Sequence, residues 1–111
     1  MSNRTYYLAL DLKDDDEAIR QYEEYHRAVW PEIIASIKES GIVHMEIYRA
    51  GNRLFMVMEV DESFSPERKG KADRENPRVQ QWEELMDKFQ QRLPFANAGE
   101  KWVVLDKIFQ L

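Results

Sequence analysis

With 111 residues the chain has room for one hydrophobic core, and the content of 43% hydrophobic and 33% charged residues predicts one folded domain over residues 1–111. The absence of cysteine excludes disulfides, zinc–thiolate sites and thiol nucleophiles. The net charge of −5 argues against a nucleic-acid partner, and the lack of a long apolar run or an apolar signal core predicts a cytoplasmic protein with no membrane partner.

The first quarter of the chain predicts a strand followed by a broken helix. Residues 5–12 alternate apolar and other side chains, which is typical of a strand with one buried face. Three acids at 14–16 then favour the start of a helix, and Pro31 predicts a break at Trp30 and a second helical piece that ends at Gly41. Apolar or ring-bearing residues recur at helical spacing through both pieces: Ile19, Tyr22, His26, Val29, Trp30, Ile33 and Ile37.

Two strands, a connection, a helix and a last strand are expected next. Residues 41–49 and 53–60 read as an antiparallel hairpin around the short loop 50–52. Residues 63–76 are expected to be a connection, and the basic residues of 67–75 to form a solvated loop because acids are interleaved among them. A helix is predicted from Pro77 to near Pro94, with a stripe of Val79, Trp82, Leu85, Met86, Phe89 and Leu93, followed by a strand over 101–110.

This order of elements is that of an α+β, ferredoxin-like domain with a four-stranded antiparallel sheet and helices on one face. The third and fourth predicted strands are apolar on both faces. Helices cover only one face, so another chain has to cover the other if it is to be kept from water. We therefore expect a two-fold symmetric homodimer through the sheet face.

Tyr22 and His26 are the pair that points to chemistry. Residues four apart on a helix lie on the same face, so both side chains can reach one small ligand. An imidazole titrates near neutrality, and an aromatic ring packs against the C–H face of a pyranose. Spacing alone favours a core histidine on an amphipathic helix and Trp82 as ordinary core packing, and it favours a half-exposed His44 over one that lines the same cavity. No phosphate loop, HExxH sequence or nucleophile elbow is present.

The segment 22–33, YEEYHRAVWPEI, resembles the signature of the L-rhamnose mutarotase family, in which a Tyr and a His four later precede Trp-Pro-Glu. The resemblance continues through Gly41 and Ile47-Tyr48, the NRLF start of the third strand, the VQQW segment that ends at Trp82, and a last strand with an aromatic end. It implies a dimeric α/β-barrel type of ferredoxin-like fold. It also implies an isomerase that interconverts the α and β anomers of a 6-deoxyhexose pyranose without a cofactor or metal.

Position by position, the resemblance implies His26 as the proton donor, Tyr22 as a substrate-binding residue and Trp82 as the first of two adjacent tryptophans in the sugar site. The sequence departs at two of the family's sugar-binding positions, which hold Glu83 in place of the second tryptophan and Met45 in place of a tyrosine. The same chemistry on a different monosaccharide is therefore expected, with L-fucose as the main candidate beside L-rhamnose.

Mutarotation needs one acid and one base, because the hemiacetal opens when the ring oxygen gains a proton and the anomeric hydroxyl loses one. The sequence leaves the partner of His26 open among Tyr22, His44, Glu46 and Glu83. Two other functions also remain open. One is a small monooxygenase or haem-degrading enzyme of the same dimeric fold that uses His26 as ligand or base. The other is a non-catalytic sugar-binding module in which Tyr22 and His26 are structural.

Overall fold

The sheet of the computed structural model, which describes residues 3–111, is antiparallel throughout. Strand β1 (Arg4–Leu12) lies between β3 (Arg53–Val60) and a divided edge strand, and β2 (Ile42–Ala50) pairs with the far side of β3. The divided edge consists of β4 (Gln90–Gln91) and β5 (Val103–Val104), which both pair with β1. The sheet is therefore four strands wide, as predicted.

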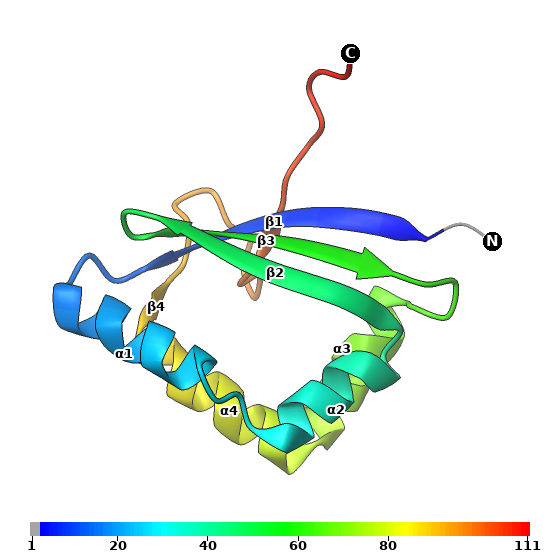
Figure 1. The fold of residues 1–111 in the computed structure, drawn as a ribbon, viewed down its shortest axis with the longest axis horizontal. Coiled ribbons are helices and arrows are strands. Elements are labelled where there is room, and N and C mark those ends of the chain that lie inside the picture. The colour runs from blue at the N-terminus through cyan, green and yellow to red at the C-terminus, as the bar shows by residue number, and fades with distance from the viewer. Residues whose placement is uncertain (1–2) are drawn as a thin grey trace.

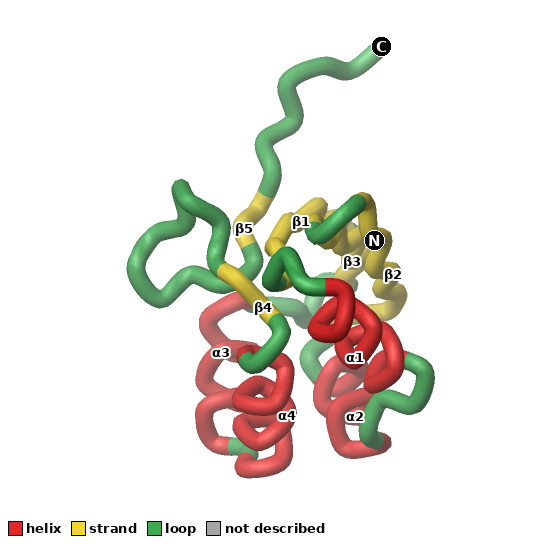
Figure 2. Tube along the Cα trace, turned by 90° about the vertical axis from the view of Figure 1, so that its left-hand side faces the viewer, coloured by secondary structure: helices red, strands yellow, loops and turns green. Residues whose placement is uncertain are grey.

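All four helices lie on one face of this sheet, in two pairs (Figures 1 and 2). Helices α1 (Asp16–His26) and α2 (Pro31–Glu39) form one pair, and α3 (Pro66–Glu75) and α4 (Pro77–Asp87) form the other. None of the helices in residues 3–111 is long and apolar enough to cross a membrane. The predicted arrangement of helices on a single face is confirmed, which leaves the opposite sheet face without cover from this chain.

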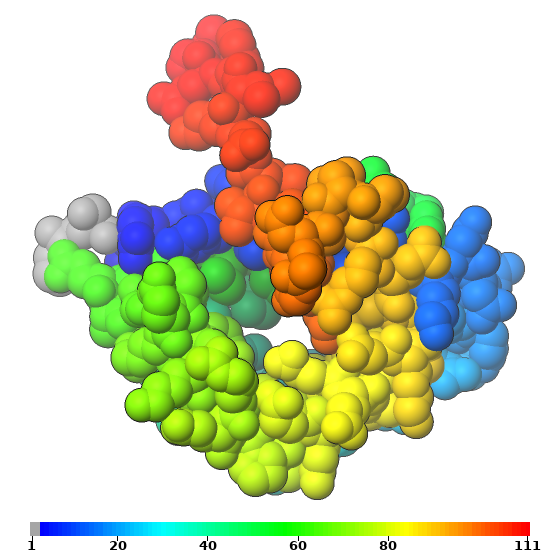
Figure 3. Space-filling view, turned by 180° about the vertical axis from the view of Figure 1, so that it is seen from behind, coloured from blue at the N-terminus to red at the C-terminus, as the bar shows by residue number. Residues whose placement is uncertain are grey.

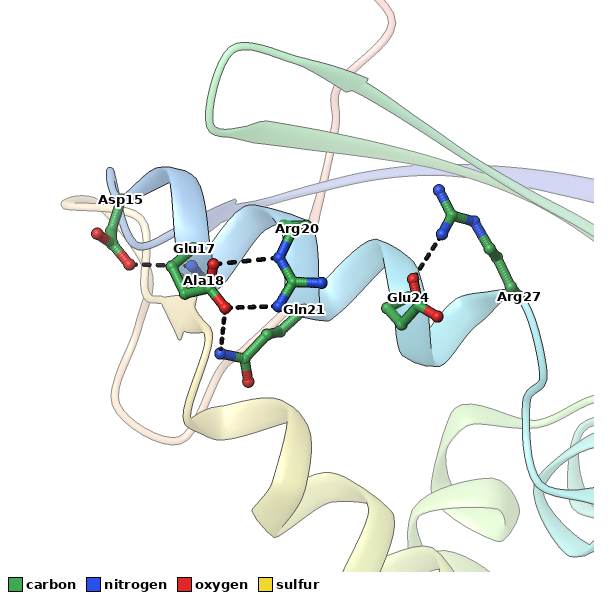
Figure 4. Close-up of polar contacts among 7 residues, drawn as sticks. All are labelled: Asp15, Glu17, Ala18, Arg20, Gln21, Glu24 and Arg27. Atoms are coloured by element: carbon green, nitrogen blue, oxygen red, sulfur yellow. Dashed lines mark hydrogen bonds and ion pairs between the residues drawn. The ribbon is translucent and has the colours of Figure 1, made fainter.

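Local sequence explains where α1 and α2 begin and end. The Asp15 side chain caps α1 by accepting a hydrogen bond from the Ala18 backbone amide at 2.9 Å. Ion pairs Glu17–Arg20 and Glu24–Arg27 lie along its polar side, each joining residues three positions apart (Figure 4). Trp30 is extended (φ −55°, ψ 137°) and Pro31 is the first residue of α2, so the predicted break at Trp30 is confirmed.

The prediction of a solvated loop over 67–75 is wrong, because these residues form α3. Ser65 caps the helix by accepting from the Arg68 amide at 3.2 Å, and Pro66 opens it. No residue of α3 is fully buried, so it lacks the apolar stripe by which a helix is recognised in sequence. An ion pair between Lys69 and Asp73, 2.7 Å long and four residues apart, supports it instead.

The predicted end of the second helix near Pro94 is also wrong. Helix α4 ends at Asp87, and the chain then turns to run beside β1. The Phe89 carbonyl accepts a hydrogen bond from the Lys13 amide at 2.8 Å, and Gln90 pairs with Leu12. The sheet edge captures this backbone, so Phe89 and Leu93 are buried without being helical.

The last strand is much shorter than the predicted range 101–110. Only Val103 and Val104 pair with β1, and the final backbone bond is from the Leu105 amide to the Tyr7 carbonyl at 2.7 Å. Residues 106–111, here called the C-terminal arm, then leave the body on the sheet side opposite the helices (Figures 1 and 3). Ile108 is 96% exposed, so the arm has no packing partner within the described chain.

Strand register assigns the two faces of the sheet. Leu8, Met56 and Ile47 are matched across β1, β3 and β2 and face the helices, together with the buried Leu10 and Leu54 of the next row. The opposite, outer face carries large side chains that remain exposed, namely Tyr7, Tyr48 and Phe55. The prediction that both faces carry apolar side chains is therefore confirmed.

Candidate active site

A cavity of about 790 Å³ lies between the inner face of the sheet and the helices. The space-filling view shows the surface hollowed between the yellow-green helices and the orange C-terminal segment (Figure 3). Its walls include all five residues that the family resemblance assigned to the site: Tyr22, His26, Met45, Trp82 and Glu83. The structure thus brings together side chains from α1, β2 and α4 that are up to 61 positions apart in the chain.

His26 is held in one orientation by its own helix. Its Nδ1 lies 2.8 Å from the carbonyl oxygen of Tyr22, one turn earlier. Because a carbonyl only accepts hydrogen bonds, Nδ1 carries the proton in the neutral ring and Nε2 carries the lone pair. Burial lowers the pKa of His26 from its usual 6.5, while the bond to the Tyr22 carbonyl acts in the opposite direction. His26 is therefore a neutral imidazole at pH 7 with Nε2 as its proton acceptor.

Tyr22 stacks beneath His26, with ring centroids 4.3 Å apart and planes tilted by 32°. The Tyr22 side chain is 3% exposed, and burial raises its pKa to about 12, with a smaller opposing effect from Gln90. The phenol is therefore protonated at neutral pH and can donate or accept a hydrogen bond.

Trp82 provides the aromatic surface next to this pair. Its ring lies edge-on to His26 with centroids 5.6 Å apart, and edge-on to Trp30 with centroids 5.1 Å apart. The residue is 8% exposed but still lines the cavity, so it belongs to the core and to the cavity wall at once. Core packing and contact with a ligand, the two alternatives for Trp82 in the sequence, are therefore compatible.

His44 and Glu46 are poorly placed to share the chemistry of His26. The register puts both on the outer face of β2, where the His44 side chain is 57% exposed and its Nε2 lies 3.0 Å from a Glu46 carboxylate oxygen. The Tyr48 hydroxyl donates to the same carboxylate at 2.7 Å. His44 contributes to the cavity wall only where β2 begins, so Tyr22 and Glu83 are the two partner candidates that face the cavity with His26.

Several polar residues of the cavity have no clear signal in the sequence. Asp73 and Lys69 line it from α3, and the Asp73 Oδ1 atom is buried with no hydrogen-bond partner among the described residues. The spacing of four between them would have indicated a helix face, had this segment been recognised as helical. Other polar or aromatic lining residues come from the segments around β4 and β5: Gln90, Lys101 and Trp102. Over residues 3–111 no cluster of three His, Asp or Glu side chains is arranged to hold a metal ion.

The architecture is that of a ferredoxin-like α+β protein, with a cavity between sheet and helices that is lined by a histidine and aromatic side chains. The family model described as L-rhamnose mutarotase matches residues 5–111 of the chain. An L-fucose mutarotase of Xanthomonas campestris pv. campestris is 46% identical over 113 aligned positions, which cover 100% of this chain and 90% of that protein. The chain therefore belongs to the L-rhamnose mutarotase family and is an isomerase.

Two further proteins are similar to this chain. A UPF0734 protein of Dictyostelium discoideum is 36% identical over 112 positions, covering 97% of this chain and 90% of that protein. The crystal structure of an L-rhamnose mutarotase from Formosa agariphila matches with a TM-score of 0.71 over 97% of this chain and 98% of that one. At 20% identity this last likeness supports the fold alone.

Proposed function

We propose that this chain interconverts the α and β anomers of a 6-deoxy-L-hexose, with L-fucose as its preferred substrate. The observation that carries the proposal is the convergence of Tyr22, His26 and Trp82 on one cavity between sheet and helices. The choice of L-fucose is supported by the 46% identity to an L-fucose mutarotase and by the two departures from the family signature, Met45 and Glu83.

His26 starts the reaction as a base in this proposal. The Nε2 lone pair takes the proton of the anomeric hydroxyl as the bond from the anomeric carbon to the ring oxygen breaks. The open aldehyde then rotates and presents its other face. The imidazolium formed in the first step is the proton donor when the ring closes, which accounts for the donor role that the family resemblance implies for His26.

Tyr22 donates its phenolic proton to the ring oxygen as the ring opens, and the phenolate takes a proton back from that oxygen when the ring closes. Its neutral phenol lies against the His26 ring, and the anomeric oxygen and the ring oxygen of a pyranose are bonded to the same carbon. A donor and an acceptor side by side therefore match the two oxygens that exchange protons. We place Glu83 among the groups that bind the sugar, since carboxylate oxygens accept hydrogen bonds from hydroxyl groups.

Apolar residues of the cavity suit the methyl group that defines a 6-deoxy sugar. Met45 and Ile47 of β2 and Met86 of α4 line the same cavity as His26. A methyl group gains free energy on leaving water for such surroundings, whereas the hydroxymethyl group of an ordinary hexose loses hydrogen bonds. We therefore expect hexoses with an intact 6-hydroxyl to be poorer substrates.

The test compares anomer exchange on L-fucose and L-rhamnose side by side, by magnetisation-exchange NMR with the spontaneous rate subtracted. The expected result is acceleration of both sugars, stronger for L-fucose, with L-galactose as the matched 6-hydroxylated control for L-fucose. A binding module or a haem-degrading enzyme predicts no acceleration of any sugar. An unchanged rate for all three sugars therefore rejects the proposal.

We also propose that the protein is a homodimer that joins through the outer face of the sheet. The outer face carries the exposed side chains of Tyr7, Tyr48 and Phe55, and the C-terminal arm leaves the body on that same side (Figure 1). The arm presents Ile108, Phe109 and Leu111, which are 96%, 76% and 109% exposed. An apolar arm beside an uncovered apolar face fits the exchange of arms between two copies.

Removal of residues 106–111 is expected to convert the dimer into a monomer, because the apolar contacts of the arm with the second copy are lost. Analytical ultracentrifugation over a concentration series measures this directly. Phe95→Ser is the matched control, since Phe95 is 65% exposed but lies outside the arm and the outer face. A full-length chain that sediments as a monomer contradicts the dimer, and a truncated chain that stays dimeric contradicts the role of the arm.

The cytoplasmic location and the single domain over 1–111 stay predictions.

A further inference from the structure

The Trp30-Pro31-Glu32 segment takes no part in the proposed proton transfers. It is instead contacted by Arg78 of α4. We propose that Arg78 is a positioning residue that clamps this segment to α4 and thereby holds Trp82 against His26. Neither Arg78, Trp30 nor Glu32 lines the cavity, so Arg78 acts on the reaction through other side chains. Its effect on catalysis rests on the proposed function, whereas the clamp itself rests only on the contacts described next.

Arg78 makes two contacts with the corner between α1 and α2. Its guanidinium carbon lies 4.0 Å from the centroid of the Trp30 ring, which is a close cation–π contact. Its Nε lies 3.3 Å from a carboxylate oxygen of Glu32, which makes an ion pair without a hydrogen bond, while its Nη1 donates to the Gln81 side chain at 2.7 Å. The residues on either side of Pro31 are thus held by one side chain, which fixes the corner to the first turn of α4.

The contact continues from the corner to the proposed catalytic ring. The Trp30 ring meets Trp82 edge-on at 5.1 Å between centroids, with an angle of 71° between planes. Trp82 in turn meets His26 edge-on at 5.6 Å and 67°. Interiors are close-packed, so a shift of the first ring is passed to the next. The rotamer of Trp82, and with it the wall beside His26, therefore depends on where Arg78 holds Trp30.

The residue preferences of a helix N-terminus do not explain an arginine at position 78. Residue 78 is the second residue of α4, whose cap is Asn76. The helix dipole makes a cation unfavourable in the first turn, where acids are preferred. A residue that opposes the local preference needs a compensating gain, and the gain here is the pair of contacts with Trp30 and Glu32. Arginine suits both because its planar group stacks on a ring while its positive charge lies beside a carboxylate.

The test uses Arg78→Met, which keeps much of the side-chain length but removes the charge and the planar group. We expect kcat for anomer exchange to fall about tenfold with a change in KM of less than about threefold, because misplacement of a wall of the site costs rate more than binding. The His26 pKa, measured by NMR titration of its ring signals, should rise toward 6.5 as the loosened wall admits water. Arg78→Lys should lie between Arg78→Met and the wild type.

Arg20→Met is the matched control, since Arg20 forms a comparable Arg–Glu ion pair with Glu17 but contacts no ring. It should leave both kcat and the His26 pKa unchanged. If Arg78→Met fails to fold, Arg78→Lys decides, and wild-type kcat with a wild-type His26 pKa in either variant overturns the proposal. If the wild type does not exchange anomers but the His26 pKa still rises in Arg78→Met, the proposed function fails and the clamp stands.

Discussion

Replacement of His26 by alanine is expected to slow catalysed exchange of L-fucose anomers by about 10²- to 10⁴-fold, the usual worth of a positioned proton-transfer group. The reason is that Nε2 of His26 is the proton acceptor placed in the cavity with its lone pair free, since Nδ1 is committed to the Tyr22 carbonyl. Magnetisation-exchange NMR at saturating sugar measures the loss. Circular dichroism establishes that the variant is folded, which is expected because His26 is only partly buried.

His44→Ala is the matched control for this substitution. It removes the other histidine of the chain, whose side chain is 57% exposed and paired with Glu46 on the outer sheet face. Its exchange rate should stay within about twofold of the wild type, because general acid–base catalysis needs a group in reach of the reacting oxygen atoms. A His26→Ala variant that keeps the wild-type rate would assign the chemistry to another residue of the cavity, with Glu83 and Asp73 as the next substitutions to make.

The pH profile of kcat/KM should rise through the pKa of His26 and then stay level. Burial lowers that pKa below 6.5, so the neutral base is the main form above it and is lost at lower pH. The rate should fall about tenfold per pH unit below the pKa of His26. At the alkaline end no second fall is expected up to about pH 10, because burial raises the pKa of Tyr22 to about 12. Exchange rates measured from pH 4.5 to 10 test both the fall at acid pH and the level part above it.

A profile that falls as pH rises through the same pKa would show that His26 has to begin the reaction as an acid. Tyr22→Phe separates the role of Tyr22 from that of His26. It should lower the level part of the profile and leave the fall at acid pH in place.

Stability has to be followed in parallel, because a histidine with a lowered pKa in the folded state binds protons more readily when unfolded. The free energy of unfolding therefore decreases as pH falls below 6.5, and melting temperatures at each pH distinguish unfolding from the titration of His26.

That the residues of the candidate site would lie close together could be predicted largely from the sequence, because they lie on strongly periodic elements. Tyr22 and His26 are one helical turn apart, so one face of α1 carries both whatever the rest of the chain does. The family resemblance then added Trp82, Met45 and Glu83, and the cavity contains all three. By contrast, Asp73 was missed because α3 has no buried stripe, and a charged helix is recognised only through its cap and ion pairs.

The sequence by itself determined the order of the main elements, the break at Trp30, the hairpin, and the face of α1 that holds His26, because each depends on neighbours within a few residues. Only the tertiary structure decided the ends of α4 and β5, because there the backbone partner is β1, far away in the chain. Tertiary packing likewise fixed the proton acceptor of His26, since burial and the position of the Tyr22 carbonyl set both its tautomer and its pKa. It also revealed the clamp on Trp30, because Arg78 is 48 positions away in sequence and meets that ring only after folding.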